Sequence, residues 1–156
     1  MSEHRSDGRR RSDDSLRQSE DRYRRLVDLS PDAVLIIQEG RVVFANPAGV
    51  RLLGGGDDAN VVGRPALDFI HPNDRRAVVA RMTEVLDGAR ETVFQERRYV
   101  RFDGTPIDVE VAATLYPDPG GPAIQVILRD ITQRKRAEVA SHESEERFRQ
   151  IAESID

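Results

Sequence analysis

Three histidines are the residues of this chain best suited to bind a metal or to transfer a proton or a phosphoryl group. They are His4, His71 and His142, and no cluster of His, Asp and Glu at metal-ligand spacing connects them. His71 precedes a predicted helix, and the residues after His142 lack the arginine and proline that surround phospho-accepting histidines. The sequence therefore predicts no metal site and no phosphorylated histidine.

Other reactive groups are equally scarce. The chain contains no cysteine, which excludes disulfides, thiolate metal sites, thiol nucleophiles and cysteine–flavin adducts. The three glycines at 54–56 are not followed by Lys-Ser/Thr, so they do not form a phosphate-binding loop. No serine lies in a nucleophile elbow with an oriented base. We predict no catalytic residue and expect any catalytic domain to lie outside this chain.

Composition and charge narrow the possible partners. The 156 residues suffice for one domain with tails, and 33% of them are charged. A net charge of −4 gives no reason to expect nucleic acid as a partner. No apolar run approaches the length of a membrane span, and the N-terminus lacks the apolar core of a signal peptide. We predict a cytoplasmic segment without membrane contact.

The chain divides into four predicted parts. Residues 1–15 are almost free of apolar side chains, so we expect a disordered tail. Residues 16–30 have a helical period that stops before Pro31. The main domain is predicted over 31–132, and a charged helical linker over 133–156. Thr132 stands at the junction, where its hydroxyl could cap the linker helix.

Within the main domain, the patterns predict five strands and several helices. The strands are expected at 33–37, 41–45, 92–101, 106–115 and 123–129, with a loop at 117–122. Asn46-Pro47 should start a short helix, short helical turns should follow, and a longer helix is expected over 74–86. This order predicts an α+β domain, in which helices cover one face of a five-stranded antiparallel sheet.

The predicted interior is apolar and could enclose a small apolar or amphipathic ligand. The alternative is that the same side chains fill the core and leave no room for a ligand. Arg97 and Tyr99 should point inward if the turn at Asp103-Gly104 has three residues, and outward if it has two. The residues predicted to line the pocket are Val34, Ile36, Met82, Leu86, Tyr99, Val109, Val111, Ile124, Val126 and Leu128.

Five short motifs, in this order and spacing, resemble the PAS (sensory-box) domains over roughly residues 23–132. They are Ser30-Pro31-Asp32-Ala33, Phe44-Ala45-Asn46-Pro47-Ala48, the run from Asp68 to Asp74 after Gly63, Asp103-Gly104-Thr105-Pro106, and Asp130-Ile131-Thr132. The resemblance implies a PAS fold flanked by N- and C-terminal linker helices, with a central ligand pocket. It also implies a signalling helix that leaves after Thr132.

The resemblance suggests a signal relay and restricts the cofactor. In relatives the aspartate equivalent to Asp130 commonly pairs with a basic residue near the late hairpin, and Arg101 is the best candidate here. The predicted relay residues are Arg101, Asp130, Ile131 and Thr132. Haem-binding relatives carry the ligand within the long helix, where His71 does not lie, and the absence of tryptophan disfavours non-covalent flavin. The identity of the ligand stays open.

An internal repeat extends the resemblance beyond one domain. The segment Ser19–Leu26, Ser-Glu-Asp-Arg-Tyr-Arg-Arg-Leu, recurs as Ser-Glu-Glu-Arg-Phe-Arg-Gln-Ile at Ser144–Ile151. Such segments resemble those between tandem PAS domains of sensor kinases and cyclic-dinucleotide enzymes, so we expect a second PAS repeat to begin here. The alternative is two unrelated amphipathic helices of similar composition.

These patterns together predict a sensory domain of a longer signal transduction protein, either a sensor histidine kinase of a two-component system or a diguanylate cyclase. The helices at 16–29 and 133–155 carry thin apolar stripes among charges, which suit a weak coiled coil in a homodimer. The competing prediction is a structural dimerisation spacer that binds no ligand.

Overall fold

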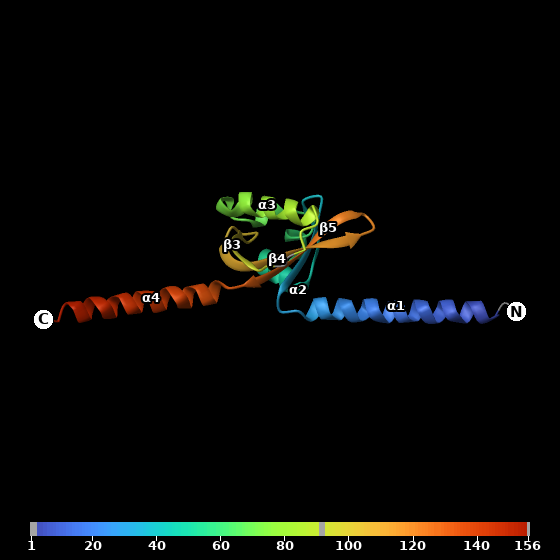
Figure 1. The fold of residues 1–156 in the computed structure, drawn as a ribbon, viewed down its shortest axis with the longest axis horizontal. Coiled ribbons are helices and arrows are strands. Elements are labelled where there is room, and N and C mark those ends of the chain that lie inside the picture. The colour runs from blue at the N-terminus through green and yellow to red at the C-terminus, as the bar shows by residue number, and fades with distance from the viewer. Residues whose placement is uncertain (1–2, 91–92, 156) are drawn as a thin grey trace.

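The computed structural model describes residues 3–90 and 93–155. A central domain lies between two long helices that leave it in opposite directions, so the two termini lie at opposite ends of the molecule (Figure 1). The helices are α1 (Glu3–Leu29), α2 (Pro47–Gly54), α3 (Arg75–Leu86) and α4 (Thr132–Glu153). Three short 3₁₀ helices separate α2 from α3: η1 (Asp58–Asn60), η2 (Ala66–Phe69) and η3 (Pro72–Asp74).

One antiparallel sheet forms the centre of the domain. Its strands are β1 (Ala33–Gln38), β2 (Arg41–Ala45), β3 (Gln95–Val100), β4 (Pro106–Asp118) and β5 (Gly121–Asp130), in the spatial order β2-β1-β5-β4-β3. The turn between β1 and β2 is tight because Glu39 and Gly40 both have positive φ, at 51° and 75°. The predicted α+β class and five-stranded antiparallel sheet are confirmed.

The core lies between the sheet and the helices that cover its inner face. Leu35 and Ile37 of β1 pack there with Val109 of β4 and Leu128 of β5, and Val85 of α3 closes the cluster. All five side chains are at most 4% exposed. Burial of apolar area on this scale is the main favourable term for a domain of this size.

A buried asparagine fastens α1 and α2 to the sheet. Asn46 Oδ1 accepts hydrogen bonds from the N–H groups of Gly49 and Val34, each at 2.8 Å. Its Nδ2 donates to the carbonyls of Val27 (2.9 Å) and Asp32 (3.0 Å). The predicted Asn46 cap of α2 is therefore confirmed, and the same side chain also holds the end of α1.

The structure corrects three predicted boundaries. Helix α1 already begins at Glu3, so residues 3–15 are helical where we predicted a disordered tail. A helix that is already nucleated gains one hydrogen bond for each residue it adds, so polar residues can extend it. The predicted loop at 117–122 is a tight hairpin turn, with Asp118 paired to Gly121. Strand β3 begins at Gln95, and the predicted start at residue 92 lies outside the described residues.

Candidate functional site

The space between α3 and the sheet holds two small cavities, which we call the chamber. Their volumes are about 30 Å³ and about 10 Å³, and Met82, Tyr99 and Val126 line both. Such volumes hold roughly two water molecules and one water molecule, respectively. The side chains therefore fill most of the interior in this state of the protein.

Most of the predicted lining residues lie on the inner face. Met82, Tyr99, Val111 and Val126 line the chamber. Val109, Ile124 and Leu128 belong to the packed core around it. Leu86 lies away from the chamber and lines a groove of about 380 Å³ at the hairpin end of the sheet, together with Pro122 and Ile124.

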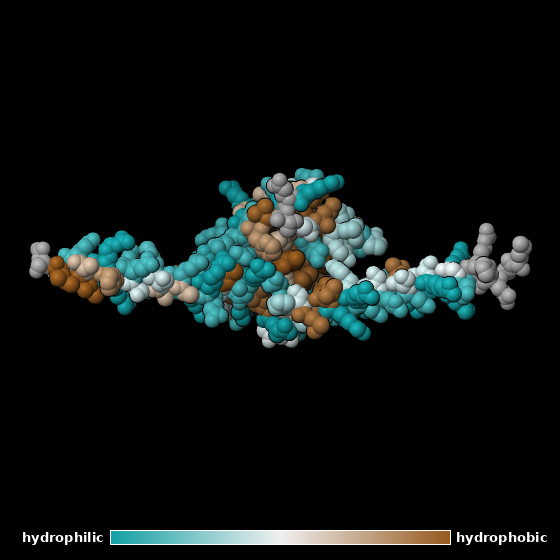
Figure 2. Space-filling model, turned by 60° about the horizontal axis from the view of Figure 1, so that its bottom comes forward, coloured by the Kyte–Doolittle hydropathy of each residue, from teal (hydrophilic) through white to brown (hydrophobic). Residues whose placement is uncertain are grey.

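The prediction for Val34 and Ile36 was wrong, because both lie on the opposite face of the sheet. Their neighbours Leu35 and Ile37 face the chamber instead. All residues from 33 to 37 are buried, so β1 lacks the alternation that would distinguish its two faces. On the outer face, Val34 and Ile36 line a groove of about 440 Å³ beside α1, with Tyr23, Val27 and Phe44. Figure 2 shows apolar surface where α1 joins the central domain.

The turn between β3 and β4 settles which residues of β3 point inward. The N–H of Arg101 donates to the carbonyl of Thr105 at 2.9 Å, so Phe102, Asp103 and Gly104 form a three-residue turn. In this register Arg97 pairs with Val109 and Tyr99 pairs with Ile107, and both side chains face inward. Tyr99 is 4% exposed, and its burial raises the pKa of the hydroxyl, which stays neutral.

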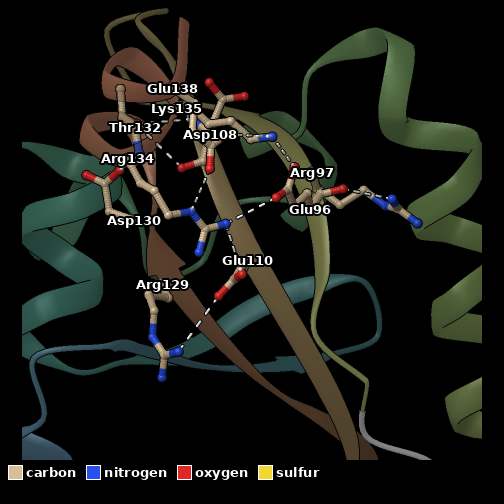
Figure 3. Close-up of polar contacts among 10 residues, drawn as sticks. All are labelled: Glu96, Arg97, Asp108, Glu110, Arg129, Asp130, Thr132, Arg134, Lys135 and Glu138. Carbon is tan, nitrogen blue, oxygen red and sulfur yellow. Dashed lines mark hydrogen bonds and ion pairs between the residues drawn. The ribbon is translucent and has the colours of Figure 1, made fainter. Parts of the chain in front are cut away.

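At the far end of β5, the relay segment joins the sheet to α4. Ile131 is buried, and its N–H donates to the carbonyl of Asp108 on β4 at 2.9 Å. The Thr132 hydroxyl accepts from the N–H of Asp108 (3.2 Å) and donates to its carbonyl (3.4 Å) (Figure 3). The first residues of α4 are therefore fastened to β4.

Two predictions about this segment were wrong. Thr132 does not cap α4, because its hydroxyl is bonded to the backbone of Asp108. Ile131 occupies the cap position, and its hydrocarbon side chain can make no hydrogen bond. Asp130 accepts the N–H of Thr132 at 2.9 Å, and the described residues show no ion pair between Asp130 and Arg101. The reason lies in the sheet: β4 separates β5 from β3, and Asp130 lies opposite Val109, which pairs with Arg97 on β3. Arg101 lies farther along, where the β3–β4 turn begins.

Charged residues from three strands surround the start of α4. Arg134 contacts Glu96 of β3 and Glu110 of β4, each at 3.1 Å. Arg129 of β5 lies 3.7 Å from Glu110 and 3.2 Å from Asp32, at the entry to β1. We call this group, which Figure 3 shows in part, the junction cluster: Asp32, Glu96, Glu110, Arg129, Arg134 and Lys135.

Hydrogen bonds within the junction cluster change the proton affinities of its members. The ammonium of Lys135 lowers the pKa of Glu96, and Arg134 adds to this effect. In turn the carboxylate of Glu96 raises the pKa of Lys135, and that of Glu110 raises the pKa of Arg134. Glu96, Arg134 and Lys135 therefore stay charged around neutral pH.

Sequence reasoning missed the junction cluster because its partners are far apart in the chain. Arg129 and Asp32, for example, are separated by 97 positions. A usable signal was the outward position of Glu110 on the strand predicted at 106–115, where a charged side chain alternates with apolar ones. That pattern indicates the outer face, but it does not identify the partner.

The described residues contain neither a group of side chains suited to bind a metal ion nor a membrane-spanning helix. Across residues 3–90 and 93–155, no three His, Asp or Glu side chains are grouped in a way that could hold a metal ion. The described helices include none with the length and apolarity needed to cross a membrane.

Comparison with known proteins identifies similar chains. Sporulation kinase A of Bacillus subtilis (strain 168) is 30% identical over 130 residues, which are 83% of this chain but 22% of that protein. The chain thus spans about a fifth of the length of this relative. The PAS domain of an HTR-like protein from Haloarcula marismortui is 26% identical, with a TM-score of 0.62, and the match covers 78% of this chain and 99% of that one.

A domain of a sensory box sensor histidine kinase/response regulator from Geobacter sulfurreducens is also similar. It is 25% identical, with a TM-score of 0.62, over 74% of this chain and 96% of that one. The family model described as the PAS fold matches residues 21–131, which include the whole sheet and the chamber. The chain therefore belongs to the PAS family and is related to the PAS domains of sensor histidine kinases.

Proposed function

We propose that this chain is the sensory part of a longer signalling protein, and that it relays the state of its chamber to α4. The observation that supports this best is the side-chain alternation of β4. Val109 and Val111 face the core and the chamber, whereas the outward side chain of Glu110 between them contacts Arg134 of α4. One residue earlier, the backbone of Asp108 is bonded to the Thr132 hydroxyl. A displacement of β4 by a ligand would therefore move the start of α4.

The energetic demand on such a relay is modest. Helix α4 has no buried residue in its described part, so it is held to the domain mainly through its first turn. Two arrangements of a helix held in this way can differ by only a few kcal/mol, which a small ligand can supply through its different affinity for the two states. The effector is then a catalytic domain outside this chain, of the histidine kinase or diguanylate cyclase class.

The internal repeat supports a second PAS domain after α4. Five residues of α1 line the outer groove beside the sheet, and each has a counterpart of similar chemistry at the same spacing in α4. The pairs are Glu20 and Glu145, Tyr23 and Phe148, Arg24 and Arg149, Val27 and Ala152, and Asp28 and Glu153. The C-terminal half of α4 would then lie against the sheet of a following domain, as α1 does here.

A homodimer through the flanking helices is the second part of the proposal. Leu26 of α1 and Ile151, its counterpart in α4, are 68% and 60% exposed, which is high for side chains of this size. Leu26 does not line the outer groove, so this position of each helix remains available to a partner helix in a coiled coil. Analytical ultracentrifugation of the chain with Ile151→Glu should show a lower dimer fraction than the unchanged chain.

The relay is tested most directly at Asp130, in the longer protein that carries the effector. Asp130→Ala removes the acceptor of the Thr132 N–H and should leave the melting temperature of the domain nearly unchanged while uncoupling the output. Asp130→Asn keeps an acceptor oxygen, so it should preserve coupling and serves as the control. Unchanged output in Asp130→Ala would refute the relay.

The competing function is a structural dimerisation spacer without a ligand, and the small volume of the chamber favours it. Native mass spectrometry of freshly purified protein separates the two functions. A retained small molecule supports sensing, whereas a chain at its bare mass favours the spacer. An absorbance spectrum of the same sample tests for haem and flavin.

A further inference from the structure

Arg97 brings a positive charge to the edge of an apolar chamber. It lies on β3 between Gln95 and Tyr99, and all three side chains line the larger cavity. Figure 3 shows the Arg97 side chain turned away from Glu96 and Lys135, toward the side on which α3 lies. Its charge opposes the effect of burial on the pKa of Tyr99, as expected for a guanidinium close to that ring.

The hydrogen bonds of Arg97 go to neutral groups. Its Nη2 donates to Gln95 Oε1 at 2.6 Å, and its Nη1 donates to the carbonyl of Glu96 at 2.8 Å. The ion pairs formed among the described residues include no carboxylate partner for it. The neighbouring Arg98 differs, because it faces outward and lies 3.9 Å from Asp108.

Arg97 is partly buried and has no carboxylate partner among the described residues, so an anionic ligand would gain a charge-assisted contact there. The fork of an arginine matches a carboxylate with two parallel hydrogen bonds. The two bonds of Arg97 to Gln95 and Glu96 fix the fork in advance, which lowers the entropy lost on binding. Arg81 also lines the larger cavity, but its guanidinium lies 3.1 Å from Glu84, so that its charge is already paired. The side chains that would surround a ligand's tail are apolar: Val78, Met82, Val111 and Val126.

We propose that the chamber binds an amphipathic monocarboxylate, with the carboxylate on Arg97 and the apolar tail among Val78, Met82 and Val126. The proposal deepens the sensory function proposed above and rests on it. The ligand class follows from the contrast between the two guanidinium groups that line the cavity: Arg81 is paired with Glu84, whereas Arg97 bonds only to neutral groups beside an apolar space.

Met82 supplies the room that the tail needs. It lines both cavities of the chamber and also the groove of about 380 Å³ at the hairpin end of the sheet. An unbranched methionine side chain adopts alternative rotamers at low cost. A change of its rotamer would join these spaces into one channel, so that binding of the tail and displacement of α3 are one event.

The test is isothermal titration calorimetry of the whole chain with octanoate, and with 1-octanol as the uncharged probe of the same length. The chain should bind octanoate more tightly than 1-octanol. Arg97→Gln should weaken octanoate binding roughly ten-fold or more, because it removes a charge-assisted bidentate contact. Arg98→Gln is the matched control on the outer face and should leave octanoate affinity unchanged.

Two further variants protect the test against a folding defect. Arg97→Lys keeps the charge without the fork and should retain part of the octanoate affinity. If Arg97→Gln lowers the melting temperature, the octanoate affinity of Arg97→Lys tests the role of Arg97 in its place. Ala113→Leu adds volume to the larger cavity, which Ala113 lines, and should abolish octanoate binding.

Several outcomes would overturn the proposal. Equal octanoate affinities of Arg97→Gln and Arg98→Gln would exclude Arg97 as the anchor. Equal affinity for 1-octanol and octanoate would exclude the carboxylate class but support an apolar chamber, so the sensory function would survive. Binding of neither probe would reject the ligand class, and the relay would then still be judged by Asp130→Ala.

Discussion

Replacing Thr132 with valine tests whether the contact between β4 and α4 is what holds the helix. The Thr132 hydroxyl is hydrogen-bonded to the backbone of Asp108 at 3.2 and 3.4 Å, in a partly buried position. Valine keeps the shape and the χ1 preference of threonine but removes both bonds. The loss of a net hydrogen bond of this kind costs about 1 kcal/mol.

That free energy corresponds to roughly a five-fold increase in the fraction of molecules whose α4 has left β4. The bond from Ile131 N–H to the Asp108 carbonyl remains, so the helix should start at the same residue. Amide hydrogen exchange followed by NMR should therefore be about five times faster at Asp108 and at Lys135, whose N–H donates to the Ile131 carbonyl at the start of α4. The melting temperature of the domain, of about 100 residues, should fall by about 4–8 °C.

Thr83→Val is the matched control. The Thr83 hydroxyl donates to the Val79 carbonyl at 3.0 Å within α3, so this change removes a side-chain hydrogen bond far from α4. It should leave exchange at Asp108 unchanged. If Thr132→Val exchanges at the wild-type rate at Asp108, or if Thr83→Val accelerates it equally, then the Thr132 contact does not hold α4 and our reasoning fails.

Two further predictions concern the remaining attachments of the flanking helices. Asn46→Ala removes the four hydrogen bonds of a buried side chain. It should lower the free energy of unfolding, measured by urea denaturation, by about 2–4 kcal/mol. Asn60→Ala loses one bond to the Gly54 carbonyl and should lower the free energy of unfolding far less. The pKa of Glu96 lies below its ordinary value of 4.5, so its ion pairs contribute stability above that pH and lose it as the pH falls through the lowered pKa. The separation of spin labels on α4 and β3 should therefore stay constant from pH 7 to about pH 5 and increase in more acidic solution; an identical increase in Glu96→Gln would assign the transition to another group.

The order of the elements was predictable because the signals that separate them are local. The cap at Asn46-Pro47 and the turn at Glu39-Gly40 depend on the chemistry of adjacent residues, and both form as expected. The α+β class follows from that order. The length of α1 was not predictable in the same way, because its polar first half has no apolar stripe to distinguish it from a disordered tail.

The site was harder to predict, for two physical reasons. A strand buried on both faces has no polar–apolar alternation, so the sequence could not tell Val34 from Leu35 as a lining residue. Ion pairs between distant strands depend on register, and the pair expected between Arg101 and Asp130 would require a register that the sheet does not have. Arg97 was predictable only conditionally, through the length of the Asp103-Gly104 turn, and the three-residue turn resolved it.

Both flanking helices are attached to neighbouring strands, and this constrains the form that a relayed signal can take. Arg129 of β5 contacts Asp32, which follows α1, while Glu110 of β4 lies within reach of both Arg129 and Arg134 of α4. Strand β5 is paired with β4 along its whole length, from Val109–Asp130 to Asp118–Gly121, so one cannot move far without the other. In the proposed relay, a ligand that displaces β4 would therefore change the orientation of α4 relative to α1, rather than loosen either helix alone. A helix pair in a homodimer responds to such a change of angle with little energy, because its thin apolar seams can repack in more than one way.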